Sequence, residues 1–383
     1  MKTLLLIGWM ATWLVGSAQD STEVPQHWLI SGYIKNLESL SFDRDFANSL
    51  SGNLLHNRIN VKWKPSEKWT VAAEWRNRLF WGEELKSIPG FAGRLRNANE
   101  ALNLQQAWIQ SGALVLHTNT ERLNIEYRAS KWNARLGRQR INWGMATTWN
   151  PNDLFNTYHF LDFDYEERPG MDGGRFQWLI SDAASVELAY AFTGERNQPV
   201  AAAKYQLNKW GYDWQLITGR YRNQFTLGAG WAGNLGEAGF KGEAQYFFRS
   251  GDSASQFNLA IESDYMLKNG WYLRAGLLYN QAGLSRPVSN IAGFDFTISP
   301  QRLMPTRWNL ILSTAKEFTP LFSANFGCLV APGTNLLLLL PSFTYNLAAN
   351  LDATLVWQSF FAEVDDRLQG LSHRAFLRLK WSF

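Results

Sequence analysis

Six arginines have the side-chain chemistry and the strand positions to bind or guide anions. Arg138 and Arg140 stand two residues apart in a predicted strand over residues 132–140, so both project from one face. A guanidinium is permanently charged and donates hydrogen bonds in a planar fork that fits carboxylates and phosphates. Gly137 beside them indicates a bulge or a close backbone approach. Further candidates on predicted strands are Arg76, Arg78, Arg135 and Arg175.

The segment after Arg140 combines acidic and aromatic residues over a long predicted loop, 141–174. Its candidate carboxylates are those of Asp162, Asp164, Glu166 and Glu167. Its aromatic residues include Phe155, Tyr158, Phe160, Phe163 and Tyr165. A loop this apolar is unfavourable in water, and a loop this acidic is unfavourable in lipid. We therefore expect it to fold inward, with its carboxylates facing arginines of the surrounding wall, led by Arg76, Arg78, Arg135 and Arg175.

Residues for bond-making chemistry are sparse. The sequence has no Gly-x-Ser-x-Gly element, no His-x-x-x-His pair and a single cysteine, Cys328, which excludes an intrachain disulfide. His117 lies near Thr118 and Glu121, but polarity at a hairpin end explains that cluster better than catalysis. We therefore predict that the protein is not an enzyme and holds no metal or other cofactor.

Alternating residues indicate which elements must position the charged side chains. Residues 55–64 and 69–81 alternate between apolar and charged types and are joined by the turn Pro65–Lys68. One face of this hairpin carries Trp63 and Trp75, and the other carries Arg58 and Arg76. Such alternation is typical of strands whose two faces meet different environments.

The same pattern recurs along the whole chain, with short turns and long connections. Short turns include Ser181–Ala184 and Lys268–Gly270, and long connections include 82–100, 141–174 and 281–305. Outer-membrane barrels have an even number of strands, short periplasmic turns and long extracellular loops, and this chain offers about 18, with roughly 16 to 20 allowed. The ambiguous stretch is Ser111–Glu121. We predict an all-β fold, a closed antiparallel transmembrane β-barrel.

Composition separates this fold from a soluble β-sandwich. The mean hydropathy is below zero, yet aromatic residues make up 15% of the chain and tryptophan alone counts 19. In a membrane barrel only half of each strand faces lipid, and aromatic rings gather at the headgroup levels. A sandwich packs two apolar faces against each other and gives no reason for so many tryptophans near strand ends.

The N-terminus has the features of a secretory leader. Lys2 precedes an apolar run, and Gly16-Ser17-Ala18 offers small residues for cleavage after Ala18. We predict a signal peptide over 1–18 and one barrel domain over 19–383, located in the outer membrane and in contact with its lipid. The alternating C-terminal strand ends on Phe383, and this tail resembles the one that the barrel-assembly machinery of Gram-negative bacteria reads.

Three sequence elements between residues 132 and 180 carry a family resemblance. They are Leu136–Gly144, Trp149–Asn156 and Glu166–Asp172, with a Gly-Arg-Gln strand end followed by Asn-Pro-Asn-Asp in the loop. This part resembles a group of porin-like outer-membrane proteins, similar in style to alginate-export and phosphate-selective porin barrels. The resemblance implies a barrel with a long loop in this place. It implies no particular solute.

These observations predict a channel for passive diffusion of small hydrophilic solutes, narrowed by the loop 141–174. Basic residues slightly outnumber acidic ones on the predicted inner faces, and charged rings bias permeation by sign, so we expect a weak preference for anions. Two alternatives to this narrowing remain open. Either the loop charges form ion pairs that brace the wall, or the loop is an exposed cap. A different class remains open, a structural barrel subunit of a larger outer-membrane complex with little transport. The pI near 9 fits basic residues of the lumen and turns better than a nucleic-acid partner.

Overall fold

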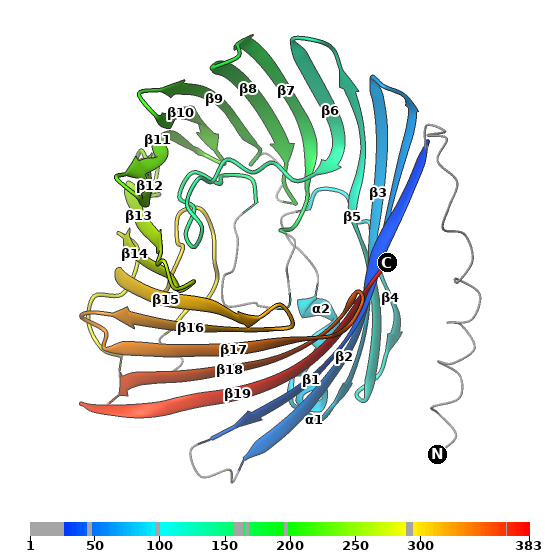
Figure 1. The fold of residues 1–383 in the computed structure, drawn as a ribbon, viewed down its shortest axis with the longest axis vertical. Helices are drawn as coiled ribbons and strands as arrows, with labels where there is room; N and C mark the ends of the chain where they lie inside the picture. Colours follow the sequence, from blue (N-terminus) through cyan, green and yellow to red (C-terminus); the bar gives the residue numbers. More distant parts are fainter. Residues whose placement is uncertain are drawn as a thin grey trace.

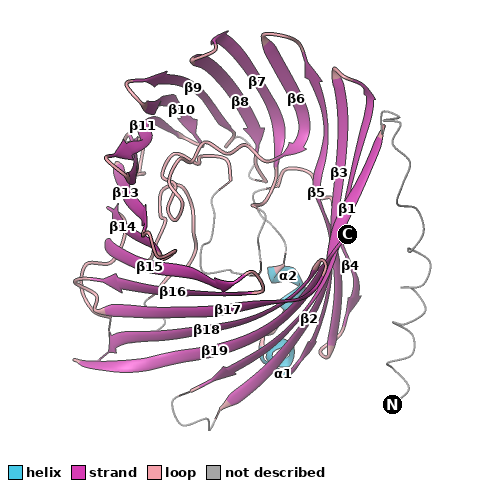
Figure 2. Cartoon of the chain, viewed as in Figure 1, coloured by secondary structure: helices cyan, strands magenta, loops and turns pink. Residues whose placement is uncertain are grey.

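A computed structural model of the chain describes residues 27–43, 48–95, 100–156, 164, 168–194, 198–288, 294–364 and 366–383. The predicted leader, 1–18, lies outside the described residues. Strands form a wall that curves around a central space, and several connecting segments lie inside that wall (Figures 1 and 2). No helix in the described part of the chain is long and apolar enough to cross a membrane.

The described residues form nineteen strands and two short helices. The helices are α1 (Glu83–Ser87) and α2 (Phe91–Arg94). The strands are β1 (Trp28–Phe42), β2 (Ser49–Ser66), β3 (Trp69–Gly82), β4 (Gln105–Gln110), β5 (Leu114–Arg128), β6 (Trp132–Gln139), β7 (Met171–Ser181), β8 (Ala184–Phe192), β9 (Val200–Lys209), β10 (Tyr212–Tyr221), β11 (Gln224–Leu235), β12 (Ala238–Phe247), β13 (Gln256–Met266), β14 (Tyr272–Asn280), β15 (Trp308–Thr319), β16 (Phe322–Ala331), β17 (Leu336–Ala348), β18 (Leu351–Val364) and β19 (Arg367–Ser382).

The sheet closes on itself. Strand β1 pairs antiparallel with β2 on one side and with β19 on the other, in a register that joins Tyr33 to Ser382. The backbone of Phe383 exchanges two hydrogen bonds with Gly32, at 2.9 and 3.0 Å. Closure removes the free edges that lipid would leave unpaired. In the described residues 18 strands complete this ring, since β4 pairs only with β5, and the predicted fold class is confirmed.

The ambiguous stretch Ser111–Glu121 belongs mainly to one long strand. We expected separate strands near 101–111 and 122–129, but β5 runs without interruption from Leu114 to Arg128. One edge of β5 pairs with β3 over its length, and the other pairs with β6 near Leu123 and with β4 near His117. Strand β6 is short and reaches only residues 123–128 of β5. Strand β4 therefore pairs with the remaining part of that edge, at residues 115–119 of β5.

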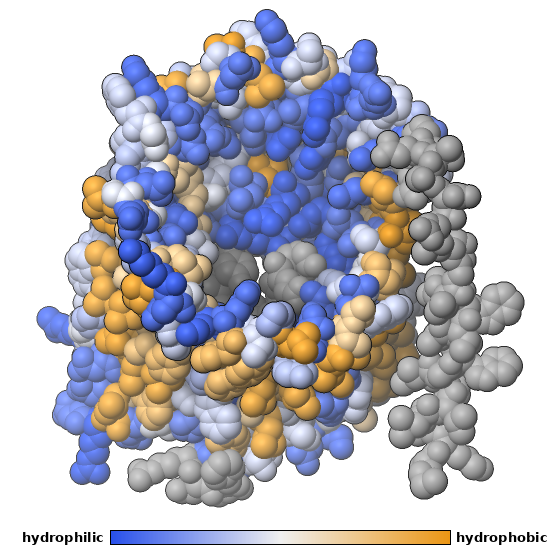
Figure 3. Space-filling model, viewed as in Figure 1, coloured by the Kyte–Doolittle hydropathy of each residue, from blue (hydrophilic) through white to orange (hydrophobic). Residues whose placement is uncertain are grey.

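The two faces of the wall differ as the alternation predicted. Outward residues such as Trp75, Leu123 and Leu136 are exposed, with Leu136 at 63%. Inward residues such as Arg58 are buried, at 1%. In Figure 3 hydrophobic residues cover much of the lower outer side, and hydrophilic residues gather along the upper side of the hollow. The exposed apolar surface is expected only where the wall contacts lipid.

We name the end of the barrel that holds the start of β1 and the end of β19 the turn end, and the opposite end the loop end. Aromatic rings gather at the turn end. Trp28 stacks on Trp63 with ring centroids 5.6 Å apart. Tyr127 lies between Trp69 and Trp132, at 4.8 and 5.1 Å. Such a row marks the level of the lipid headgroups.

At Gly137 the backbone has a φ of 109°. A Cβ at this position would lie 2.3 Å from the carbonyl oxygen of Leu123 on the neighbouring strand. The predicted close backbone approach at Gly137 is therefore confirmed, and any larger residue would force β5 and β6 apart.

Candidate functional site

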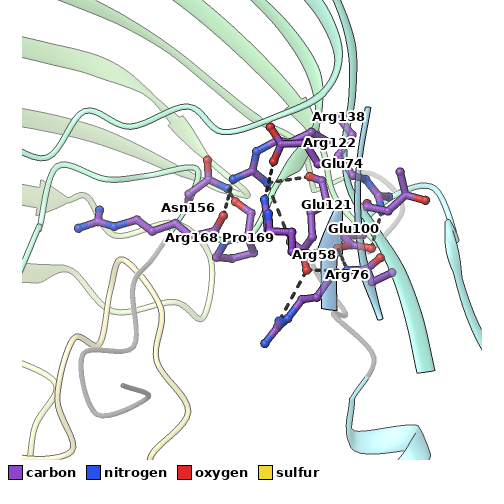
Figure 4. Close-up of polar contacts among 12 residues, drawn as sticks. Arg58, Glu74, Arg76, Glu100, Glu121, Arg122, Arg138, Asn156, Arg168 and Pro169 are labelled. Carbon is purple, nitrogen blue, oxygen red and sulfur yellow. Dashed lines mark hydrogen bonds and ion pairs between the residues drawn. The ribbon is translucent and has the colours of Figure 1, made fainter. Parts of the chain in front are cut away.

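Paired charges line the inner face of β2, β3 and β5 (Figure 4). Arg58 donates to the carboxylate of Glu74 at 2.5 Å, and Arg76 lies 3.6 Å from the carboxylate of Glu121. Arg122 reaches inward to the backbone carbonyl of Arg168 at 2.6 Å. These strands thus present a ladder of basic groups, partly neutralised by acids, to the lumen.

Arg138 is almost completely enclosed by partners. Its guanidinium donates to Asp172 and Glu100, each at 2.8 Å, and to the backbone carbonyl oxygens of Leu102 and Thr120. This bidentate, charge-assisted arrangement joins β6, β7, β5 and the segment before β4. Arg138 therefore braces the wall, which is one of the roles the sequence left open for the charges of this region.

The first part of the loop, residues 141–156, lies against the inner face of β8 to β13. Two wall glutamates, Glu243 on β12 and Glu262 on β13, accept hydrogen bonds from its backbone. The donors are Met145, Ala146 and Asn152 to Glu243, at 2.5, 2.6 and 2.9 Å, and Thr147 and Thr148 to Glu262, both at 2.7 Å. Carboxylates that receive several backbone N–H groups hold a segment firmly, because each bond is charge-assisted.

Aromatic residues of the loop are buried against the wall. Trp143 packs edge-on against Phe155, with ring centroids 5.0 Å apart, and both rings are buried. The indole N–H of Trp143 donates to Glu187 at 2.5 Å, and Gln215 donates to its backbone carbonyl at 3.0 Å. The inner wall thereby removes apolar surface of the loop from water.

The returning part of the loop is fixed through Arg168. Its guanidinium pairs with Asp153 and also donates to Asn150 at 2.5 Å and to Asn142 at 2.9 Å. Asp153 is fully buried, and this burial raises the pKa of its carboxyl to about 6, although the charge of Arg168 acts in the opposite direction.

Of the four predicted loop carboxylates, Asp164 is described, whereas Asp162, Glu166 and Glu167 lie outside the described residues. Asp164 pairs with Lys35 of β1 at 2.8 Å and lies 3.5 Å from the ring of His56 of β2. Burial alone would raise the pKa of Asp164, but the hydrogen bond from His56 and the charge of Lys35 hold it below its ordinary value. Asp164 therefore contacts Lys35 and His56, while the predicted partners Arg76 and Arg78 line the same cavity as Asp164. The pairing of the loop carboxylates with wall arginines stays a prediction.

The other predicted arginines take different places. Arg78 lies 3.3 Å from His117. Arg135 pairs with Glu126, and Arg175 donates to Asn133 at 2.7 Å. These last two contacts are with residues of the wall itself, so neither arginine pairs with a described carboxylate of the loop. The Nε atom of Arg140 has no hydrogen-bond partner among the described residues.

A second segment, the described residues 281–288 and 294–306, also packs inside the barrel, and the sequence did not predict it. Leu303 and Met304 are buried with inward residues of β13 to β18 and with Trp149 of the first loop. Asn280 donates to the backbone carbonyl of Met304 at 2.5 Å. One signal for this was present. The run Leu336–Leu340 is apolar on both faces, as expected for a strand that is covered on both sides.

The described residues contain no group of three or more histidine, cysteine, aspartate or glutamate side chains that could hold a metal ion. Among the described acidic residues of the lumen, Glu74 accepts from a guanidinium group, Glu243 from backbone N–H groups, and Asp164 from the ammonium group of Lys35.

No protein-family model matches this chain, and no curated protein matches it by sequence. Its fold is similar to solved structures of several Occ and Opd proteins. OccK2 (OpdF) of Pseudomonas aeruginosa aligns with a TM-score of 0.59 and 9% identity over 93% of this chain and 98% of its own. OpdQ of Pseudomonas aeruginosa gives 0.58, and OccAB4 of Acinetobacter baumannii gives 0.57, each with 9% identity over 94% of this chain and 99% of the other.

These similarities show a shared fold. A closed strand ring with an apolar outer face is expected in a membrane, since its exposed surface is too apolar for water and its strand pairing continues around the ring without a free edge. The chain is therefore a transmembrane β-barrel, and the predicted location in the outer membrane is confirmed.

Proposed function

We propose that this protein is an outer-membrane channel through which small hydrophilic solutes diffuse passively, with a weak preference for anions. The observation that carries the proposal is a closed ring with a charged inner face and a long segment bonded to that face. The turn end faces the periplasm and the loop end faces the exterior, because outer-membrane barrels keep their long loops outside.

Two anchors on opposite walls support a narrowing role for the loop 141–174. Glutamates of β12 and β13 hold its first part, whereas Lys35 and His56 of β1 and β2 hold Asp164. In the strand order of the ring, β12 and β13 lie about half way around from β1 and β2 (Figure 1). These two anchors leave less open lumen between the walls, so that solutes would pass beside the anchored residues.

The second inward segment supports a pathway that runs off-centre. It covers the apolar inner face of β13 to β18. Solutes would then pass along β1 to β6, where the basic ladder lies. Of the residues predicted from the sequence we propose Arg76, Arg78, Arg140 and Asp164 as pore-lining, and we propose wall-bracing roles for Arg135, Arg138 and Arg175. Asp162, Glu166 and Glu167 remain predicted members of the constriction.

A reversal-potential measurement tests the ion preference. In a KCl gradient across a planar bilayer we expect chloride to permeate modestly better than potassium. Arg140→Gln should weaken this preference more than Arg135→Gln, because Glu126 already neutralises Arg135. A preference for potassium would contradict the proposal. A silent protein that co-purifies in fixed ratio with other outer-membrane proteins would favour the structural-subunit alternative.

The pair of Asp153 and Arg168 should make the ion preference depend on pH. The pKa of Asp153 is about 6, so above that pH Asp153 carries a negative charge beside Arg168, and below it this negative charge is lost from the pair. Anion preference should therefore increase as the pH falls through about 6, and Asp153→Asn should show the low-pH preference at every pH. Reversal potentials between about pH 5 and pH 8 check this, and identical profiles for both proteins would contradict it.

The proposal also covers how the protein reaches the outer membrane and which kind of solute it carries. We infer that the leader 1–18 is cleaved after Ala18 and that the assembly machinery reads the strand ending in Phe383, which resembles its recognised tail. The resemblance of residues 132–180 to phosphate-selective and alginate-export barrels is compatible with an anionic solute and names none.

A further inference from the structure

A groove of about 1260 Å³ lies on the outer face of the wall, at the loop end of β6 to β10. These strands are consecutive neighbours in the ring (Figure 1). The groove is lined by exposed apolar side chains, those of Leu102, Leu136, Tyr190 and Phe192, with exposed fractions of 42 to 63%. It therefore belongs to the surface that contacts lipid and not to the lumen.

Glycines form part of the floor of this groove. In the interior of a strand a glycine marks the close approach of another backbone or of a ligand. For Gly137 and Gly173 the approaching group is backbone, because a Cβ would lie 2.3 and 2.0 Å from carbonyl oxygens of the neighbouring strands. For Gly174 it is not, because a Cβ there would lie 3.0 Å from the end of the Leu136 side chain and 4.0 Å from the nearest carbonyl oxygen. Gly174 leaves open space on the lipid side.

The strand register turns this open space into a trough. Leu136 of β6 pairs with Gly174 of β7, and Gly174 pairs with Tyr190 of β8, so the three residues form one row. Neighbouring strands are ~4.8 Å apart, which separates the two outer members of the row by about 10 Å. The ring of Tyr190 packs edge-on against Phe192, with centroids 5.0 Å apart, and extends this side of the trough. A linear acyl chain fits between two such apolar sides.

A basic residue lies at the loop-end rim of the groove. Arg220 lines the groove one residue before the end of β10. It points outward, since it shares a face with the exposed Leu216 and pairs with the exposed Phe225 of β11. Its Nε donates to the backbone carbonyl of Arg222 at 2.9 Å, and no described carboxylate forms an ion pair with it. An outward arginine is unfavourable in hydrocarbon and favourable at the level of lipid phosphates.

The acidic group in the groove is already neutralised. Asp172 is the only carboxylate among the described lining residues. Its two oxygens accept from the guanidinium of Arg138, both at 2.8 Å, and one of them also accepts from the backbone N–H of Leu102. The groove therefore offers an incoming lipid an apolar trough and one positive charge at the headgroup level.

We propose that this groove binds lipid A, the anionic, multiply acylated lipid of the outer leaflet. Arg220 binds a phosphate group, and an acyl chain lies in the trough over Gly174. The volume of the groove exceeds the ~300–1,000 Å³ of pockets for small molecules, which favours a lipid with several chains. This inference goes beyond the proposed function. It takes from it only the orientation that places the loop end outside, and it requires no flux through the lumen.

Native mass spectrometry of the full folded barrel in detergent, titrated with hexa-acylated lipid A, tests the binding. Dephosphorylated lipid A keeps the chains without the charge, and phosphatidylethanolamine has a phosphate but no net charge. We expect one lipid A per barrel, bound about fivefold or more tightly than either control, the effect of one arginine at an anionic lipid surface. Equal affinities for the three lipids would overturn the inference.

Variants on the rim and in the trough locate the site. Arg220→Gln should weaken lipid A about fivefold and leave the dephosphorylated lipid unchanged. Gly174→Leu should weaken both, because its side chain fills the trough, and Gly174→Ala should show a smaller loss in the same direction. Two controls should bind as the wild type does: Lys268→Gln in an exposed turn at the turn end, and Ala353→Leu on the outward face of β18. Wild-type affinity in Arg220→Gln or in Gly174→Leu, with the folded gel mobility retained, would overturn the inference.

Planar-bilayer recordings separate this inference from the proposed function. A conducting protein that does not bind lipid A would refute the groove proposal and leave the channel intact. A silent protein that binds lipid A with the expected variant pattern would support the groove and refute the channel.

Discussion

Replacing residues 155–168 by a short Gly-Ser linker should raise single-channel conductance by roughly twofold or more, because an unobstructed ring of this strand number encloses an aqueous channel. The replacement removes Phe155, the Asp164 anchor and the Arg168 clamp together. It leaves Glu243 and Glu262 in the wall. Ion preference should change as well, since the charges of the loop leave the lumen.

Recordings of the folded barrel in planar bilayers measure this effect. A matched control replaces the exposed turn 251–253 by Gly-Ser-Gly, which alters a connection of the same kind without touching the inward loop. Glu243→Gln combined with Glu262→Gln should give an intermediate and noisier channel, because the backbone of the loop loses its charged acceptors. Unchanged conductance and selectivity in the loop replacement would show that the narrowing lies elsewhere.

Arg138→Met should destabilise the barrel by about 3–5 kcal/mol, the usual effect of removing one partner from a buried ionic cluster. Arg138 is 1% exposed, and its loss leaves the carboxylates of Glu100 and Asp172 buried without their cation. The free energy of unfolding is measured by urea titration in lipid vesicles, with the folded fraction read from heat-dependent gel mobility.

A rescue variant separates charge from packing. Adding Glu100→Gln and Asp172→Asn to Arg138→Met should recover a large part of the stability, because no unpaired charge then remains buried. Arg220→Met is the control, since Arg220 is exposed and makes one hydrogen bond to a backbone carbonyl, and its effect should stay within about 0.5 kcal/mol. Wild-type stability in Arg138→Met would mean that the cluster does not brace the wall.

The wall of the barrel could be predicted because its signal is local. Alternation places Arg58 inside and Trp75 outside whatever the rest of the chain does, since successive side chains of a strand point to opposite faces. The requirement that every backbone group be paired in lipid then turns a set of such strands into a closed ring. The close backbone approach at Gly137 could be predicted for the same reason, because the lack of a side chain is a property of that single position.

The partners inside the lumen could not be predicted. Asp164 meets Lys35, which is distant in the chain, only because the ring carries β1 and the loop to the same place. The binding of the loop backbone to Glu243 depends equally on the register of β12. Strand β4 was misjudged because its place depends on how short β6 is, and pairing length is decided by neighbours.

The amino-acid sequence by itself determined that the wall consists of β-strands with an apolar outward face and a charged inward face. The sequence also identified the strand that completes the ring. It also determined that one acidic and aromatic loop had no favourable place in either lipid or open water. Only the tertiary structure decided which charges neutralise one another and that a second segment fills part of the lumen. Pairing across a lumen depends on distances through space that alternation along the chain does not specify.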